Sequence, residues 1–240
     1  MNDSGILGVL GGMGPLATLD FLRKVLDATP ARVDQDHVPV VTSSIPQVPD
    51  RTAAFRGQGE SPLPALIASG ERLKRAGAGL IVIPCNTAHL WFEQLQQALG
   101  LPMLHLVDAA LDETAALVPA DAKVGLMGTA ATIESRLYVD RRDDGRQWLL
   151  PTDVEMHTWV MPGIEAVKAG DRAGGAALLV LAAQALADRG AEALLLGCTE
   201  IPLVLDNGNA PRPVVDATAA LARRSVDWAL AQRAGQERVG

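Results

Sequence analysis

Two cysteines occupy similar places in this sequence, each directly after a strand-like stretch. Cys85 follows the apolar run Leu80 to Ile83 and a proline, and Cys198 follows Glu192 to Leu196 and a glycine. Apolar runs of this length, bounded by Gly and Pro, predict buried parallel strands. Ligands bind at the carboxyl ends of such strands. Both thiols are therefore predicted to lie at a ligand-binding edge of a sheet.

Simpler explanations exist for thiols in such positions. A free cysteine is often buried in a core, where it does no chemistry. A disulfide is disfavoured because redox-motif spacing is missing. Cys85 and His89 are four residues apart and could share a helix face, but a zinc site needs further ligands. No histidine is placed with a cysteine and a carboxylate in a way that predicts a Cys–His nucleophile.

The hypothesis that uses both cysteines is acid–base chemistry. A thiol between a strand end and a helix start lies near backbone N–H groups and the helix dipole, which lower its pKa. One thiolate could remove a proton from a carbon acid while the other thiol returns a proton to the opposite face. Asn86, Thr87 and Thr199 could then bind a carboxylate, or equally be ordinary helix N-caps.

The two halves of the chain align around these cysteines. Residues 75–85 match residues 188–198 without a gap, and a Gly-Ala pair precedes each cysteine at the same distance. Upstream, Gly8 lies 77 residues before Cys85 (85 − 8), and Gly125 lies 73 before Cys198 (198 − 125). Such a duplication predicts two pseudo-symmetric halves, each donating one strand end to a shared cleft. Chance similarity of two βα units is the alternative.

The order of elements predicts an α/β fold. Strand signals alternate with Ala- and Leu-rich helical patterns, which is typical of mostly parallel sheets flanked by helices. We expect two pseudo-symmetric domains with the active site in the cleft between them. The first would comprise 1–105 plus 212–240 and carry Cys85, and the second would comprise 106–211 and carry Cys198.

Two cations occupy comparable places in the halves. Arg51 lies in a Pro- and Gly-rich loop from 46 to 64, which is long for a structureless connection and therefore favours a function. Lys168 ends a helix predicted to begin at the capping box Thr152–Glu155 and to kink at Pro162. Each is more often a surface charge, but as a pair they could hold a second carboxylate.

The glycines from Gly8 to Gly14 follow the first predicted strand. Their spacing differs from the dinucleotide and Walker fingerprints, which disfavours a nucleotide site. We expect instead that they let the backbone approach a small ligand.

Composition bounds the class of protein. The chain has 240 residues and a net charge of −7, which disfavours a nucleic-acid surface. No apolar run reaches the length of a membrane span, and the N-terminus lacks a signal-peptide pattern. We therefore expect a cytoplasmic protein without membrane or nucleic-acid partners, whose cysteines are reduced.

At its motifs the chain resembles the aspartate/glutamate racemase family, in particular the aspartate racemase branch. The motifs are GVLGGMGP (8–15), PQVPDRT (46–52), PCNTAH (84–89), GLMGTAATI (125–133), VKAG (167–170) and GCTE (197–200). The glutamate racemase branch has Asp-Ser near the first glycines and His after the second Cys-Thr. Here Gly12-Met13 and Glu200 stand there, which argues against that branch.

The resemblance implies a homodimer that racemises an amino acid without pyridoxal phosphate or a metal. It implies Cys85 and Cys198 as the catalytic pair, with Arg51 and Lys168 holding the side-chain carboxylate. The other substrate-binding residues that we expect are Met13, Asn86, Thr87, Thr129, Thr132 and Thr199.

The substrate depends on the parts of the chain that match the family least. Ala131 replaces a usual glycine, Glu134 is unusual, and the match is loose from His157 to Glu165. Aspartate is the expected substrate, with glutamate or a broad set of amino acids next. The alternatives are a catalytically silent protein that binds small acids and a related isomerase, decarboxylase or lyase that needs one thiol.

Overall fold

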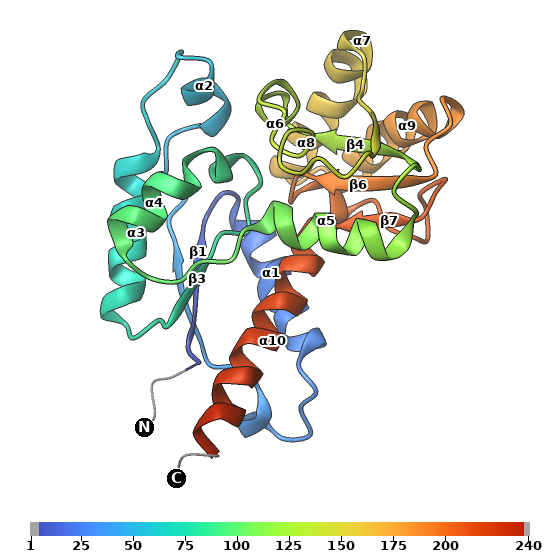
Figure 1. Ribbon diagram of the computed structural model, residues 1–240. Helices are drawn as coiled ribbons and strands as arrows, with labels where there is room; N and C mark the ends of the chain where they lie inside the picture. Colours follow the sequence, from blue (N-terminus) through green and yellow to red (C-terminus); the bar gives the residue numbers. More distant parts are fainter. Residues whose placement is uncertain (1–4, 238–240) are drawn as a thin grey trace. The chain divides into compact units, whose positions relative to one another are not determined.

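The computed structural model describes residues 5–237, which fold as two compact units. One unit comprises the chain up to Leu106 together with the segment from Thr218 onward, and the other comprises Val107–Ala217. Each unit contains a parallel sheet with helices packed on it (Figure 1). The predicted fold class of two similar α/β units with parallel sheets is confirmed.

The first unit is built on a sheet with the strand order β2-β1-β3. Its strands are β1 (Leu7–Gly11), β2 (Val40–Ser44) and β3 (Leu80–Val82), all parallel. The helical elements of this unit are α1 (Pro15–Ala28), η1 (Asp34–Asp36), α2 (Arg51–Phe55), α3 (Leu63–Arg75), η2 (Thr87–Trp91), α4 (Phe92–Leu99) and nearly all of α10 (Ala217–Glu237).

The second unit is built on a sheet with the order β5-β4-β6-β7. Its strands are β4 (Lys123–Gly128), β5 (Gln147–Leu149), β6 (Ala193–Gly197) and β7 (Val214–Asp216), all parallel. Its helical elements are nearly all of α5 (Leu106–Leu117), then α6 (Ala130–Glu134), α7 (Asp153–Glu155), η3 (Met156–Val160), α8 (Met161–Lys168), α9 (Arg172–Asp188) and η4 (Ile201–Leu203).

The central strands of the two sheets pair in the same register. In the first unit Gly8 of β1 lies opposite Ile81 of β3, and the cysteine follows four residues later (85 − 81). In the second unit Gly125 of β4 lies opposite Leu194 of β6, and the cysteine again follows four residues later (198 − 194). The alignment of the two halves in the sequence therefore corresponds to an equivalence of strands.

The edges of the sheets differ from expectation in two places. We expected residues 102–105 to form a short strand, and they contribute one isolated parallel bridge, between Met103 and Ile81. The equivalent neighbour in the second unit is β7, whose Val214 pairs with Leu194. This pairing puts β7 in the second sheet, whereas the sequence-based division had assigned 212–240 to the first domain. The strand belongs with the sheet that its hydrogen bonds extend.

Helices pack on both faces of the first sheet and on at least one face of the second, and the buried strands β1, β3, β4 and β6 are largely apolar. In the first unit α3 and α4 pack on the face that carries Leu10, Ile81 and Ile83, while α1 and α10 lie on the other side of the sheet (Figure 1). In the second unit α8 and α9 cover the face that carries Leu194 and Leu196. The packing of these helices holds the central strands, and with them their carboxyl ends, in place.

The helix predicted to run from Thr152 towards Lys168 is interrupted. The predicted capping box is present, because the Glu155 N–H donates to Thr152 Oγ1 and the Thr152 N–H donates to the Glu155 carboxylate, at 3.2 and 2.7 Å. The π-helical turn η3 follows, and Pro162 lies in the first turn of α8. Because proline cannot donate an N–H to the preceding turn, the irregularity falls where the kink was predicted.

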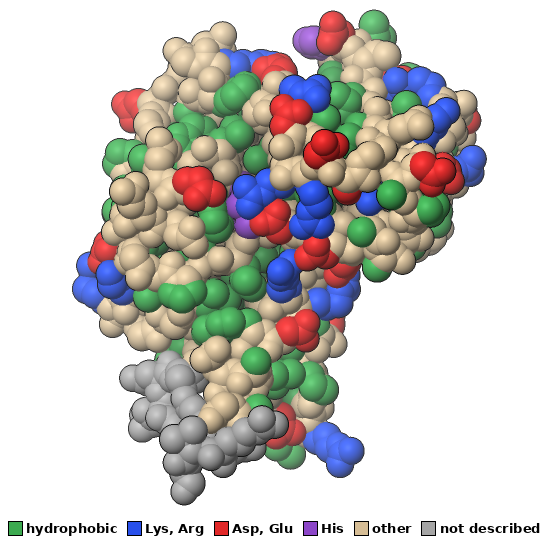
Figure 2. All heavy atoms as spheres, viewed as in Figure 1, with side chains coloured by type: hydrophobic (Ala, Val, Ile, Leu, Met, Phe, Trp, Pro, Cys, Tyr) green, Lys and Arg blue, Asp and Glu red, His purple; other side chains and the backbone are tan. Residues whose placement is uncertain are grey.

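The surface of the described chain carries both signs of charge. On the face drawn in Figure 2, acidic and basic side chains are interspersed among hydrophobic and neutral ones. Ion pairs join several of them, for example Arg136 with Asp140 and Arg141 with Asp108. Within residues 5–237, no helix is long and apolar enough to cross a membrane.

Candidate functional site

Cys85 lies just beyond the carboxyl end of β3 and is buried. Its backbone N–H donates to the carbonyl of Ile83 at 2.8 Å, which turns the chain sharply after the strand. The 3₁₀ turn η2 begins at Thr87, and Asn86 before it makes no side-chain capping bond. A short 3₁₀ turn therefore follows this thiol, and the α-helix α4 begins only at Phe92.

His89 holds this turn in place. Its Nδ1 donates to the carbonyl of Cys85 at 2.8 Å, because its Nε2 accepts from the backbone N–H of Leu106 at 3.1 Å. The ring also stacks on Phe92. Both ring nitrogens are hydrogen-bonded to the backbone, so His89 has a structural role beside Cys85. Only its spacing from the cysteine could have indicated this role.

Met13 lies in the glycine-rich turn after β1. It is buried and belongs to the same apolar cluster as Cys85. Gly12 has a φ of +95° and lies so close to Ile45 that a Cβ atom would come within 2.5 Å of its backbone. The Gly12 N–H donates to Thr18 Oγ1 at 2.8 Å. The glycine-rich turn is thus shaped by packing on its own unit, a reason that the sequence did not indicate.

Arg51 begins the short helix α2, which interrupts the loop predicted from 46 to 64. Asp50 caps this helix by accepting from the N–H of Ala53 at 2.7 Å. Nη1 of Arg51 donates to the carbonyls of Val48 and Pro49, and its Nε is buried without a hydrogen-bond partner among the described residues. Helix α2 contacts η2, which brings Arg51 to the segment after Cys85.

Cys198 occupies the equivalent place beyond β6 and is also buried. Its thiol donates to Oε2 of Glu200 at 3.1 Å, and Thr199 Oγ1 donates to the same oxygen at 3.4 Å. Thr199 and Glu200 are buried as well. A carboxylate thus accepts hydrogen bonds from two side chains at this strand end.

The pKa of Cys198 lies well above its ordinary value, which contradicts the expected lowering. Burial is the main cause, the negative charge of Glu200 adds to it, and the positive charge of Lys168 opposes it. Only the three-residue turn η4 follows the cysteine, so the helix dipole expected to favour a thiolate is small. At neutral pH the Cys198 thiol therefore keeps its proton.

Lys168 is the last residue of α8 and is exposed. Its charge acts on Cys198, and α8 contacts η4, the turn that follows this cysteine. In each unit, then, a helix that carries a cation packs on the short turn after the cysteine. Arg51 is the first residue of α2, whereas Lys168 is the last residue of α8. The two cations therefore occupy opposite ends of their helices.

Thr129 and Thr132 lie at the neighbouring strand end of the second unit. Thr129 caps α6 by accepting from the N–H of Thr132 at 3.2 Å, and their hydroxyls are 3.0 Å apart. Gly128, the residue before Thr129, pairs with Gly197, the residue before Cys198. The expected residues Thr129, Thr132, Cys198 and Thr199 therefore gather at adjacent strand ends of one sheet.

Tyr138 is a further residue near Cys198 that the sequence did not indicate. It is the only tyrosine in the chain and is completely buried. Its ring packs on Gly197, where a Cβ atom would come within 3.1 Å of Cε2. Burial raises the pKa of Tyr138 well above its ordinary value, and the charge of Cys198 adds to this effect. No spacing or periodicity linked it to the cysteine.

A family model described as Asp/Glu/Hydantoin racemase matches residues 10–224. The chain belongs to this family. The match covers both strand ends that carry a cysteine. The expectation of a racemase enzyme is therefore confirmed at the level of the family.

Individual relatives agree with this assignment. The chain is 29% identical over 233 residues to the broad specificity amino-acid racemase RacX of Bacillus subtilis (strain 168), covering 94% of this chain and 99% of that protein. A glutamate racemase of Deinococcus radiodurans is 30% identical over 225 residues, covering 89% of this chain and 71% of that protein.

Solved structures show the same fold. The aspartate racemase of Picrophilus torridus has a TM-score of 0.85 and 32% identity, covering 93% of this chain and 94% of that one. An aspartate racemase homologue from Pyrococcus horikoshii OT3 has a TM-score of 0.74 and 26% identity, covering 94% of this chain and 99% of that one. The resemblance read from the motifs is thus confirmed by sequence and by structure.

Proposed function

We propose that this racemase interconverts the enantiomers of aspartate, with Cys85 and Cys198 as its two acid–base groups. The observation that carries the proposal is the shared register of the two units. Cys85 lies four residues after Ile81, which pairs with Gly8, and Cys198 lies four residues after Leu194, which pairs with Gly125. A buried thiol at the equivalent point of each sheet supplies the two acid–base groups that a two-base inversion requires.

In the proposed reaction one proton leaves the α-carbon of the amino acid and another is added to its opposite face. The thiolate of one cysteine takes the α-proton and becomes a thiol, and the electron pair of the broken C–H bond stays on the α-carbon. The thiol of the other cysteine then donates its proton to the opposite face and becomes a thiolate. Asn86, Thr87 and Thr199 follow the cysteines within two residues and would bind the α-carboxylate. No cofactor takes part in these steps.

The two cysteines have different partners, which assigns their starting roles. Cys198 is buried beside a carboxylate and holds its proton, as the raised pKa indicates. In this proposal Cys198 donates its proton in one direction of the reaction while Cys85 takes the α-proton, and the two roles exchange in the reverse direction. Lys168 stabilises the Cys198 thiolate that remains after the transfer, because its positive charge favours the ionised form.

The preference for aspartate rests on the cations and on relatives. Arg51 keeps a buried Nε donor, and Lys168 reaches the region of Cys198 with its charge. Two cations would hold the side-chain carboxylate of a dicarboxylic amino acid. The Picrophilus torridus structure, an aspartate racemase, supports the same choice. The similarity to RacX supports broad specificity as the second candidate.

Chiral chromatography after incubation with single enantiomers tests the proposal directly. Without added cofactor, L-aspartate should become racemic, and in heavy water the α-hydrogen should exchange as it does so. Cys85→Ala and Cys198→Ala should each abolish racemisation. Full racemisation by either variant would rule out the two-thiol mechanism. If the unmodified chain turns over no amino acid, the alternative of a catalytically silent binding protein is favoured instead.

A substrate panel separates the candidates for specificity. Arg51→Ala and Lys168→Ala should raise KM for aspartate and glutamate much more than KM for alanine or leucine. Equal effects on acidic and neutral amino acids would contradict the clamp. Comparable turnover of many neutral amino acids would instead favour the broad-specificity candidate. We also propose a homodimer, as the family resemblance implies, and light scattering coupled to size-exclusion chromatography tests it.

A further inference from the structure

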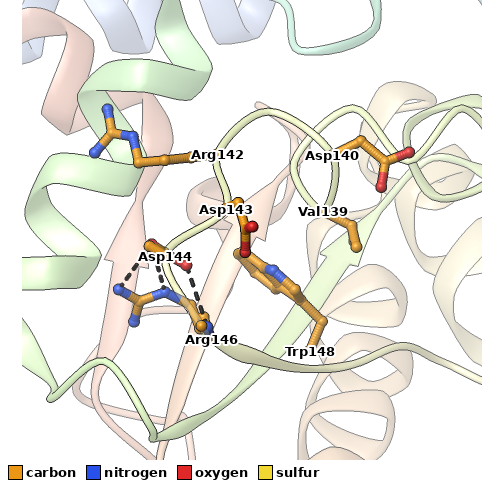
Figure 3. A pocket seen from close by; sticks show the side chains of 8 residues that line it. Val139, Asp140, Arg142, Asp143, Asp144, Arg146 and Trp148 are labelled. Carbon is orange, nitrogen blue, oxygen red and sulfur yellow. Dashed lines mark hydrogen bonds and ion pairs between the residues drawn. The ribbon is translucent and has the colours of Figure 1, made fainter.

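A separate pocket lies within the second unit, in the segment between α6 and β5. Its volume is about 360 Å³, which lies within the range of small-molecule sites. Figure 3 shows the chain curving around it. The residues that line it are Val139, Asp140, Arg142, Asp143, Asp144, Gly145, Arg146 and Trp148. None of them belongs to the expected racemase site.

Arg146 is the buried charge of this pocket. Its side chain is only 1% exposed, and Nε and Nη2 each lie 3.3 Å from Oδ2 of Asp144, toward which Figure 3 shows the guanidinium turned. Its Nη1 is buried without any hydrogen-bond partner in residues 5–237. A buried donor on a charged group left without an acceptor is costly. Arg146 lines the pocket and Nη1 lies beneath its surface, so an acceptor on a bound molecule would remove that cost once the guanidinium turns toward it.

The other charges of the pocket determine what kind of molecule fits. Arg142 is paired with Asp112 of α5 at 2.8 Å, and Asp140 is paired with Arg136. Asp143 is exposed and forms no hydrogen bond or ion pair within the described chain. The pocket therefore keeps one carboxylate available for a cation, beside the one guanidinium nitrogen available for an anion.

The formal charge of the pocket wall disfavours a purely anionic ligand. Three aspartates and two arginines line the pocket, which gives its wall a formal charge of −1. A phosphate would meet this negative wall, whereas a molecule with one positive and one negative group would be neutral overall. Val139 and Trp148, both half-buried, add an apolar surface for the remainder of such a molecule.

We propose that this pocket binds a free α-amino acid as its zwitterion. The α-carboxylate accepts from Nη1 of Arg146, the ammonium group donates to Asp143, and an apolar side chain lies against Trp148. The site is distinct from the racemase residues and does not depend on their proposed roles. Trp148 also lies 6.4 Å, between ring centroids, from Tyr138, whose ring packs on the residue before Cys198. An occupied pocket would thus contact a side chain next to that strand end.

Fluorine NMR of the chain labelled with 5-fluorotryptophan provides a local readout. The chain has four tryptophans, and Trp148→Phe assigns the resonance of Trp148 by its disappearance. The probes are leucine, 4-methylpentanoate, which lacks the amino group, and 3-methylbutylamine, which lacks the carboxylate. Leucine should shift the Trp148 resonance to saturation, and each analogue should bind at least about tenfold more weakly.

Variants at the two charges complete the test. Asp143→Asn changes an exposed residue and should remove the advantage of leucine over 4-methylpentanoate, while racemase activity is unchanged. Arg146→Gln should remove the advantage over 3-methylbutylamine. The proposal is overturned if leucine leaves the Trp148 resonance unmoved at millimolar concentration, or if leucine and 4-methylpentanoate shift it with equal affinity. Neither result bears on whether the chain racemises aspartate, which chromatography measures separately.

Discussion

The thiol of Cys198 donates a hydrogen bond to the carboxylate of Glu200, with Sγ and Oε2 3.1 Å apart and both residues buried. Two residues after Cys85, the equivalent position is held by Thr87, which carries no charge. The strands that present the two thiols share one register, yet within residues 5–237 a carboxylate hydrogen-bonds the thiol of Cys198 and none hydrogen-bonds that of Cys85. The symmetry of the fold therefore does not extend to the electrostatics of its strand ends.

Replacing Glu200 with Gln should lower the pKa of Cys198. The substitution removes the negative charge and the carboxylate acceptor that favour the protonated thiol, so ionisation should occur at lower pH. In a Cys85→Ser background Cys198 is the only thiol, and its thiolate absorbance in the ultraviolet can be titrated. Glu192→Gln, an exposed carboxylate before the same strand, is the control and should leave the titration unchanged. A rise in the Glu200→Gln variant would contradict this account.

The stability of the protein should fall at alkaline pH because of Cys198. Its pKa is raised in the folded state above the ordinary value of 9.0. A group of this kind contributes its full stability below the unfolded-state pKa and loses it as pH rises through the folded-state pKa. Urea unfolding at increasing pH should show a steeper decline for the unmodified chain than for Cys198→Ala. Parallel declines would mean that the thiol is not the group responsible.

Lys168→Met should raise the pKa of Cys198 further, the opposite of the effect of Glu200→Gln. The lysine is the charge that opposes burial and Glu200, so its removal leaves the thiolate less favoured. The same ultraviolet titration measures the change. Arg172→Met, which removes an exposed cation at the start of α9, should have little effect. If both variants shift the titration equally, general surface charge rather than Lys168 acts on the thiol.

Much of the fold could be predicted because its strands are short apolar runs with clear ends. The runs before Cys85 and Cys198 were found at nearly their observed positions, and the shared spacing indicated the duplication. The position of β7 could not be predicted in the same way. A three-residue strand carries too little pattern to indicate which sheet it extends, and only its pairing with β6 decides this.

The expected pKa of the thiols shows where sequence patterns stop being informative. A strand end followed by small polar residues predicted a helix N-terminus and a lowered pKa. The chain instead forms a short 3₁₀ turn after Cys198, and this turn places Glu200 against the thiol. Burial and a carboxylate at 3.1 Å outweigh a weak dipole, and both depend on side-chain positions that no residue spacing reveals.

His89→Ala should destabilise the first unit and disturb the turn that contains Cys85. It would leave the carbonyl of Cys85 and the buried N–H of Leu106 without their partners, at a cost of about 2–5 kcal/mol. His157→Ala is the matched control, because His157 is exposed and bonds a single carbonyl, that of Asp153. Urea unfolding of the two variants measures the difference. A loss of stability no greater than that of the control would show that His89 does not hold the turn.

Gly12→Ala should be far more destabilising than Gly57→Ala, although both glycines have a positive φ. At Gly57, with φ +70°, no atom lies within 4 Å of an added Cβ, so only backbone strain of about 1 kcal/mol is expected. At Gly12 the Cβ would also come within 2.5 Å of the Ile45 backbone, which adds the cost of overpacking and gives about 2–4 kcal/mol in all. Thermal and urea unfolding measure both variants. Because Met13 follows Gly12 directly, Gly12→Ala should also impair racemisation, while Gly57→Ala should leave racemisation intact. Equal stability of the two variants would mean that the turn can move away from Ile45.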